Sequence, residues 1–104
     1  MKESELMRQI QLEASKLGAR LLRNNVGMLK DRRGTYVRYG LGSGSSDLIG
    51  WYKGRFLAVE VKIGNEEPTE EQENFLEQVQ LDGGIAICAR SIKDFVDIFK
   101  AAIR

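Results

Sequence analysis

Residues 46–62 read SDLIGWYKGRFLAVEVK, and this stretch decides the fold. Two β-prone runs, 47–51 and 55–63, flank a Tyr52-Lys53-Gly54 turn and predict an antiparallel hairpin. Side chains along the second strand alternate between its two faces. One face carries Leu57, Val59 and Val61, and the other carries Ala58, Glu60 and Lys62.

The charged residues near the end of the second strand point to a site. A Glu60 and a Lys62 in an otherwise apolar strand are costly unless they pair or bind something. Asp47 begins the first strand, and folding about the turn places it opposite residues 59–62. We therefore expect two carboxylates and a lysine to meet beside the Gly/Ser-rich loop at 40–46.

Two carboxylates at one point suit a hard divalent cation, Mg²⁺ or Mn²⁺. A cation held there polarises a phosphate and activates water for attack. We expect Lys62 to stay protonated and either to position that water or to stabilise the negative charge that develops. The alternative is a structural Glu60–Lys62 pair, with Asp47 capping the glycine loop.

The remaining chain adds helices and further strands. Apolar spacing predicts a helix over 3–17, and capping boxes at Thr69–Gln72 and Ser91–Asp94 open two more. Strands are expected at 35–39 and 85–89, while 19–23 is either a strand or a helix tail. The order α-β-β-β-α-β-α predicts an α/β domain over 1–104, with a mixed central sheet flanked by helices.

The composition excludes several chemistries. There is no histidine and only one cysteine, Cys88. Histidine-dependent catalysis, histidine-ligated metals, zinc ribbons and internal disulfides are therefore excluded. We expect a reducing, cytoplasmic setting. No signal peptide opens the chain and no apolar run approaches the ~20 residues of a membrane span, so we expect no membrane partner.

Charge is divided unevenly along the chain. Residues 1–56 hold 11 Lys/Arg and 5 Asp/Glu, a net of +6, whereas 57–104 hold 5 and 10, a net of −5. This asymmetry indicates an anionic partner such as nucleic acid, although a balanced, solvated surface would show it too. The candidate DNA contacts, mostly to phosphate, are Arg23, Asn25, Lys30, Arg32, Arg33, Arg38, Ser45 and Ser46. Tyr36 and Tyr39 either stack on a base or pack in the protein.

The motifs resemble a known superfamily. Asp47, twelve intervening residues and Glu60-Val61-Lys62 resemble the D…(D/E)-x-K core of PD-(D/E)XK nucleases, and most closely their VRR-NUC branch. The proline of the superfamily name is absent, and Ser46 stands in its place. Other motifs similar in order and spacing are Glu3-Ser-Glu5-Leu-Met, Arg23-Asn24-Asn25-x-Gly27, the glycine-rich loop, Glu71-Gln72-x-x-Phe75 and Gly83-Gly84.

The resemblance implies a restriction-endonuclease-like core and a metal-dependent nuclease, in a standalone form such as those of phages or bacteria. It also implies that the Val61 carbonyl binds the metal and that a glutamate of the first helix lies nearby. Of Glu3, Glu5 and Glu13, the helical wheel places Glu3 on the face toward the sheet. Gln72 also faces the sheet, either to bind water or phosphate or to cap its helix with Thr69.

The function expected from these features is structure-selective cleavage of DNA. The related standalone nucleases resemble Holliday junction resolvases, so we expect a homodimer that cuts four-way junctions. The candidate contacts are Trp51, Tyr52 and the apolar outer face of the last helix. The alternatives are a flap or replication-fork nuclease, a catalytically silent nucleic-acid-binding module and a plain protein-interaction domain.

Overall fold

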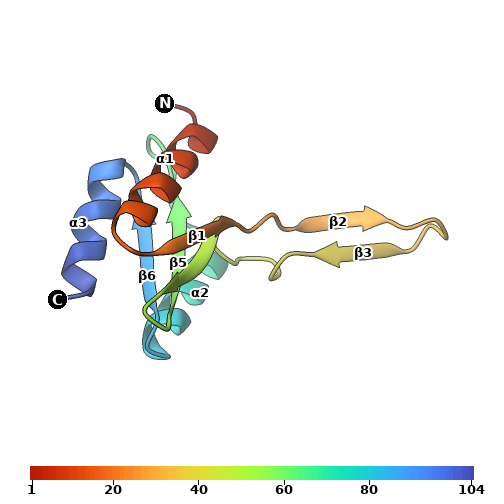
Figure 1. The fold of residues 1–104 in the computed structure, drawn as a ribbon. Coiled ribbons are helices and arrows are strands. Elements are labelled where there is room, and N and C mark those ends of the chain that lie inside the picture. Colours follow the sequence, from red (N-terminus) through yellow and green to blue (C-terminus); the bar gives the residue numbers. More distant parts are fainter.

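A computed structural model describes residues 1–104 and has three layers (Figure 1). The elements are α1 (Glu3–Lys16), β1 (Arg20–Arg23), β2 (Gly27–Lys30), β3 (Tyr36–Tyr39), β4 (Leu48–Tyr52), β5 (Arg55–Val61), α2 (Glu70–Leu81), β6 (Ile85–Ala89) and α3 (Ile92–Ala102). Helices α1 and α3 pack on one face of the sheet, and α2 packs on the other over β5 and β6. None of these helices has the length and hydrophobicity that crossing a bilayer requires.

The central sheet has four strands in the order β1-β4-β5-β6. Strands β1, β4 and β5 are antiparallel neighbours, whereas β5 and β6 run parallel. The predicted α/β class with a mixed sheet is therefore confirmed, and residues 20–23 form a strand rather than a helix tail. The hairpin of β4 and β5 pairs Leu48 with Val59 and Trp51 with Phe56.

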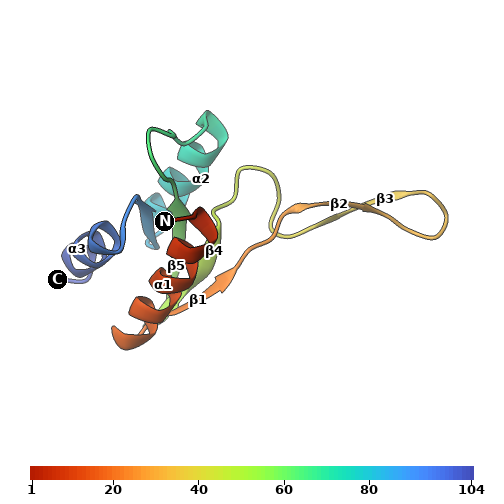
Figure 2. The ribbon, with the colours of Figure 1, turned by 90° about the horizontal axis from the view of Figure 1, so that it is seen from above.

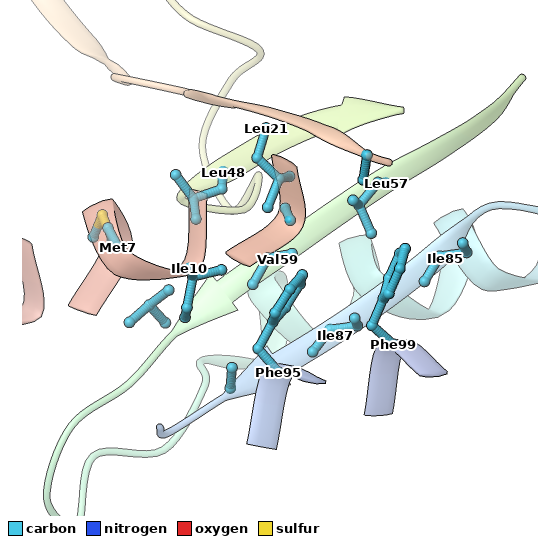
Figure 3. Packing of buried hydrophobic residues seen from close by; sticks show 14 of the residues in the cluster. Met7, Ile10, Leu21, Leu48, Leu57, Val59, Ile85, Ile87, Phe95 and Phe99 are labelled. Atoms are coloured by element: carbon cyan, nitrogen blue, oxygen red, sulfur yellow. The ribbon is translucent and has the colours of Figure 1, made fainter. Parts of the chain in front are cut away.

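One cluster of buried apolar side chains lies between the sheet and helices α1 and α3 (Figure 3). The stripe predicted on the first helix supplies Leu6, Ile10 and Ala14, which are buried. From α3, Phe95 and Phe99 stack with their ring centres 5.6 Å apart. One face of β5, with Leu57, Val59 and Val61, is therefore buried in this cluster. The other face, which carries Glu60, lies on the side of the sheet that α2 covers.

Capping interactions begin both α2 and α3, but only the predicted box at Thr69–Gln72 is complete, because the Asp94 carboxylate accepts from the Arg90 N–H and not from the Ser91 N–H. The Thr69 hydroxyl accepts a hydrogen bond from the Gln72 N–H, and the Gln72 side chain accepts one from the Thr69 N–H. The Ser91 hydroxyl accepts a hydrogen bond from the Asp94 N–H at 3.0 Å. Such bonds satisfy N–H groups that a helix start leaves without partners.

Strands β2 and β3 form a separate two-stranded hairpin, here called the arm (residues 27–39). It projects from the body in both views (Figures 1 and 2). The strand predicted at 35–39 forms, but its partner is residues 27–30, for which no strand was predicted, and not a strand of the central sheet. Alternating β-prone residues indicate a strand but do not specify its partner. Neither Tyr36 nor Tyr39 packs in the core, because both are exposed on the arm.

Candidate active site

Asp47 and Glu60 come together through the register of the hairpin. Leu48 pairs with Val59, so Asp47, one residue before Leu48, comes opposite Glu60. The Asp47 carboxylate accepts a hydrogen bond from the Val61 N–H at 2.8 Å. The meeting of these carboxylates expected from the hairpin is confirmed.

Glu60 is held in an unusual state for a carboxyl group. Its residue is 1% exposed, and Oε2 is buried without a hydrogen-bond partner. Burial, and next the neighbouring Asp47 carboxylate, together raise the pKa of Glu60 to about 9. A buried carboxylate oxygen without a hydrogen-bond partner lowers the stability of the fold. Binding of a proton or a cation to the Glu60 carboxyl would offset that cost.

Lys62 follows the last residue of β5 and is half-buried. Its positive charge lowers the pKa of both Glu60 and Glu3, which opposes the effect of burial. It makes no ion pair within 4.0 Å of a carboxylate. The ammonium group is therefore close to the acidic pair and still free to bind an anionic ligand.

Glu3 is the glutamate of α1 whose pKa is affected by the charge of Asp47. Burial raises the pKa of Glu3, as do the charges of Asp47 and Glu66, while Lys62 and Arg23 lower it. In contrast, Glu5 is exposed and Glu13 forms an ion pair with Lys16 at 3.2 Å. Of the three glutamates, Glu3 is therefore the one whose pKa responds to the charges of Asp47 and Lys62.

The donor set fits a divalent cation that keeps some of its waters. No group of three acidic, histidine or cysteine side chains is arranged to hold a metal. Mg²⁺ typically takes one or two carboxylates and completes its shell with water and phosphate oxygens. Asp47 and Glu60 supply that pair, and the unpartnered Glu60 oxygen is a hard donor for it. Direct ligation by Glu3 or by the Val61 carbonyl stays a prediction.

Asn24 is a positioning residue that the sequence did not single out. Its amide nitrogen donates to the Ser45 hydroxyl at 2.8 Å and to the Ser46 carbonyl at 2.9 Å. Its amide oxygen accepts from the Leu41 N–H at 3.3 Å. These bonds tie the glycine-rich loop to the end of β1, directly before Asp47. Only the tertiary contact across 17 to 22 residues identifies this role.

Three predicted site residues have side chains that bond within the protein. Ser46 is fully buried and its hydroxyl donates to the Leu48 carbonyl, which removes its side chain from the predicted DNA contacts. Ser46 is buried because it lies just before β4, whose first residue, Leu48, belongs to the core. The Gln72 side-chain oxygen caps α2 and makes no hydrogen bond with Asp47 or Glu60. Ser45 is half-buried, and its hydroxyl donates to the Gly42 carbonyl.

The predicted DNA contacts divide between the body and the arm. Arg23 ends β1, close enough to Glu3 for its charge to lower the pKa of that carboxyl. Asn25 is exposed between β1 and the arm. The other four are exposed on the arm: Lys30, Arg32, Arg33 and Arg38. The positive charge therefore extends away from the acidic pair rather than surrounding it.

Comparison with known proteins identifies relatives of this architecture. The family model described as the VRR-NUC domain matches residues 2–92. No curated protein matches the chain. A solved structure described as a VRR_NUC domain protein superposes with a TM-score of 0.59 at 18% identity, covering 99% of this chain and 88% of the other. At that identity the structural likeness concerns the fold alone.

Proposed function

This chain belongs to the VRR-NUC domain family, whose members are nuclease-type domains that act on DNA, and we propose that it is a divalent-metal-dependent DNA endonuclease. One observation carries the proposal. The Glu60 carboxyl is buried against Asp47 with an oxygen that has no protein partner. A purely structural pair would gain stability by replacing that acid with an apolar side chain.

The residues divide the work of hydrolysis between them. Asp47 is oriented by the Val61 N–H, and Glu60 is oriented by its burial, so both oxygens are fixed before a ligand arrives. When bound there, a divalent cation supplies the charge that polarises the scissile phosphate. The Lys62 ammonium donates to the phosphate as negative charge develops on its oxygens. Water adds to phosphorus as the bond to the leaving sugar oxygen breaks, and the proton that the water loses is balanced by one that the departing oxygen takes up from solvent.

The substrate we propose is branched DNA, cut by a homodimer. The exposed arginines and lysine of the arm suit contacts to phosphate rather than to base edges, which favours recognition of DNA shape over sequence. Two symmetric cuts across a four-way junction require two active sites related by a two-fold axis. Flap and replication-fork DNA are the alternative substrates.

Cleavage of labelled four-way, flap and linear DNA tests the proposal. We expect cutting with Mg²⁺ or Mn²⁺, none with EDTA, and none by the Asp47→Ala variant. Glu5→Ala is the matched control, since Glu5 is an exposed acid of α1. DNA binding without cutting under either metal would contradict the nuclease proposal and favour a binding module. Cutting of linear DNA as fast as junctions would contradict the selectivity.

A further inference from the structure

Arg90 lies beside Lys62 at the carboxyl ends of the parallel strands β5 and β6, which end at the same edge of the sheet (Figure 1). The register of these strands pairs Glu60 with Cys88. Just beyond both strands, the Lys62 N–H donates to the Ala89 carbonyl at 3.1 Å. In a parallel ladder such a bond continues the register, so Arg90 comes opposite Lys62.

The alternation of side chains puts Arg90 on the face of the sheet that carries the acidic pair. Residues two apart along a strand share a face, which puts Lys62 with Glu60. Likewise Arg90 shares the face of Cys88, the registered neighbour of Glu60. Burial raises the pKa of the Cys88 thiol, and the charge of Arg90 opposes this effect more strongly than that of Lys62 does. Arg90 is therefore a close neighbour of this cluster.

An exposed carboxylate and one carbonyl hold the Arg90 guanidinium in the structure. Nη2 lies 3.0 Å from a Glu67 carboxylate oxygen, and Nη1 donates to the Gly64 carbonyl at 3.2 Å. The Glu67 side chain is 78% exposed and belongs to the loop 62–69 between β5 and α2. Ion pairs with such exposed partners contribute little free energy. Another anion can therefore displace Glu67 from the guanidinium.

The spacing of the two cations suits a DNA strand. The backbones of neighbouring strands in a sheet lie ~4.8 Å apart, and successive phosphates of one DNA strand are displaced by ~3.4 Å along the helix axis. Long side chains on neighbouring strands, such as Lys62 and Arg90, can therefore reach neighbouring phosphates. The planar guanidinium of Arg90 also donates to two phosphate oxygens at once, a geometry that an ammonium lacks.

A ligand has access to Arg90 from the end of the sheet. Arg90 is one of the residues that line a hollow there, together with Met1, Ile63, Gly64 and Ile92. In open α/β sheets, the space outside the carboxyl ends of parallel strands is where ligands bind. A DNA strand can therefore approach Arg90 without a rearrangement of the sheet.

We propose that Arg90 binds the DNA phosphate next to the scissile one, and that Glu67 occupies its guanidinium until DNA takes its place. Lys62 acts on the phosphate that is cut, whereas Arg90 fixes the position of the strand. This inference rests on the proposed endonuclease function and adds a phosphate-binding residue to that site. The competing interpretation is that Arg90 only ties the loop 62–69 to the end of β6.

Fluorescence anisotropy with labelled four-way junction DNA and Mg²⁺ tests the proposal, in an Asp47→Asn background that slows cutting. Arg90→Ala should weaken binding about tenfold and lower the slope of log affinity against log salt by about 1. Arg90→Lys should restore the slope but only part of the affinity, because it keeps the charge and loses the planar fork. Lys100→Ala, which removes an exposed cation of α3, should change neither quantity.

The Glu67→Gln substitution should act in the opposite direction. It removes the carboxylate that competes with phosphate, so DNA binding should strengthen up to about fivefold. In the Arg90→Ala background the same substitution should have no effect. Glu70→Gln, at another exposed acid three residues further on, is the control and should act equally with and without Arg90. Urea unfolding checks that each variant folds.

Neutral methylphosphonate groups, placed one at a time along the DNA, locate the phosphate. The group next to the cut position should weaken binding about tenfold when Arg90 is present and should have no further effect on Arg90→Ala. Equal losses with and without Arg90 at every position would overturn the proposal. So would an Arg90→Ala chain that is less stable but keeps its affinity and salt slope, since Arg90 would then only hold the loop.

The outcomes separate this inference from the proposed function. A chain whose DNA affinity depends on Arg90 at one phosphate but that never cuts DNA retains the phosphate site and loses the nuclease. A chain that cuts DNA equally well with and without Arg90 retains the nuclease and loses the phosphate site.

Discussion

The Asp47 carboxylate accepts a hydrogen bond from the Val61 N–H at 2.8 Å, which joins the start of β4 to the end of β5. The bond fixes the aspartate beside Glu60, its neighbour across the hairpin. A single strand register thus determines both the position and the orientation of the acidic pair.

Asp47→Asn should remove the negative charge of residue 47 while keeping its hydrogen bond with the Val61 N–H. The amide oxygen can still accept from the Val61 N–H, so the fold and DNA binding should persist. Loss of the negative charge should lower the cleavage rate by about 10²-fold or more. Single-turnover cleavage with Mg²⁺ measures the rate, and Glu5→Gln is the control. Retention of wild-type cleavage by Asp47→Asn would exclude Asp47 from metal binding.

The metal-free protein should lose stability as the pH rises. Because the pKa of Glu60 is about 9 in the folded chain and 4.5 ordinarily, the carboxyl takes up a proton on folding between these two pH values. Its contribution is fully present below pH 4.5 and disappears as the pH rises through about 9. Urea unfolding in EDTA should show this decline in the wild type.

Glu60→Gln should remove that decline. The neutral amide needs no proton, so we expect about 1–3 kcal/mol greater stability than the wild type in EDTA at alkaline pH. Glu77→Gln, on the exposed side of α2, should unfold like the wild type. Parallel pH profiles for the wild type and Glu60→Gln would contradict the assigned state of Glu60.

Binding of Mg²⁺ near neutral pH should release about one proton, because the metal requires the ionised form of Glu60. Isothermal titration calorimetry in buffers of different ionisation enthalpy measures the number released. Glu60→Gln should release none. Equal proton release by both proteins would assign the proton to another group.

Asn24→Ala should loosen the glycine-rich loop. The substitution removes three hydrogen bonds of the Asn24 side chain, to Ser45, Ser46 and Leu41. We expect a loss of about 1–3 kcal/mol in the free energy of unfolding and about tenfold or more in cleavage rate. Asn25→Ala is the matched neighbour, and it should leave the rate at saturating DNA unchanged. Equal effects of the two substitutions would contradict the positioning role of Asn24.

The tip of the arm should supply salt-dependent affinity for DNA. Replacing Arg32 and Arg33 together with alanine should reduce the slope of log affinity against log salt by about 2. Both side chains are exposed within the turn that Asp31 closes, where the Arg33 and Thr35 N–H groups donate to the Asp31 carboxylate. Fluorescence anisotropy at several salt concentrations measures the slope. A double substitution of Lys100 and Arg104, on the acidic half of the chain, should leave it unchanged.

The sequence by itself determined the parts of the fold that depend on near neighbours. Turn residues 52–54 and the period-two pattern of 55–63 specify the β4–β5 hairpin and hence the meeting of Asp47 and Glu60. The capping box at Thr69 and the serine cap at Ser91 are likewise set within three residues. Pairs across a tight turn and bonds within a helix start have little freedom, so local pattern suffices to predict them.

Only the tertiary structure decided the properties that depend on distant contacts. The arm leaves the sheet because residues 27–30 pair with 36–39, an outcome that strand propensity does not encode. Ser46 is buried and Asn24 holds the loop because β1 lies beside β4. The raised pKa of Glu60 arises from burial beneath packed elements, and that environment exists only once the chain has folded.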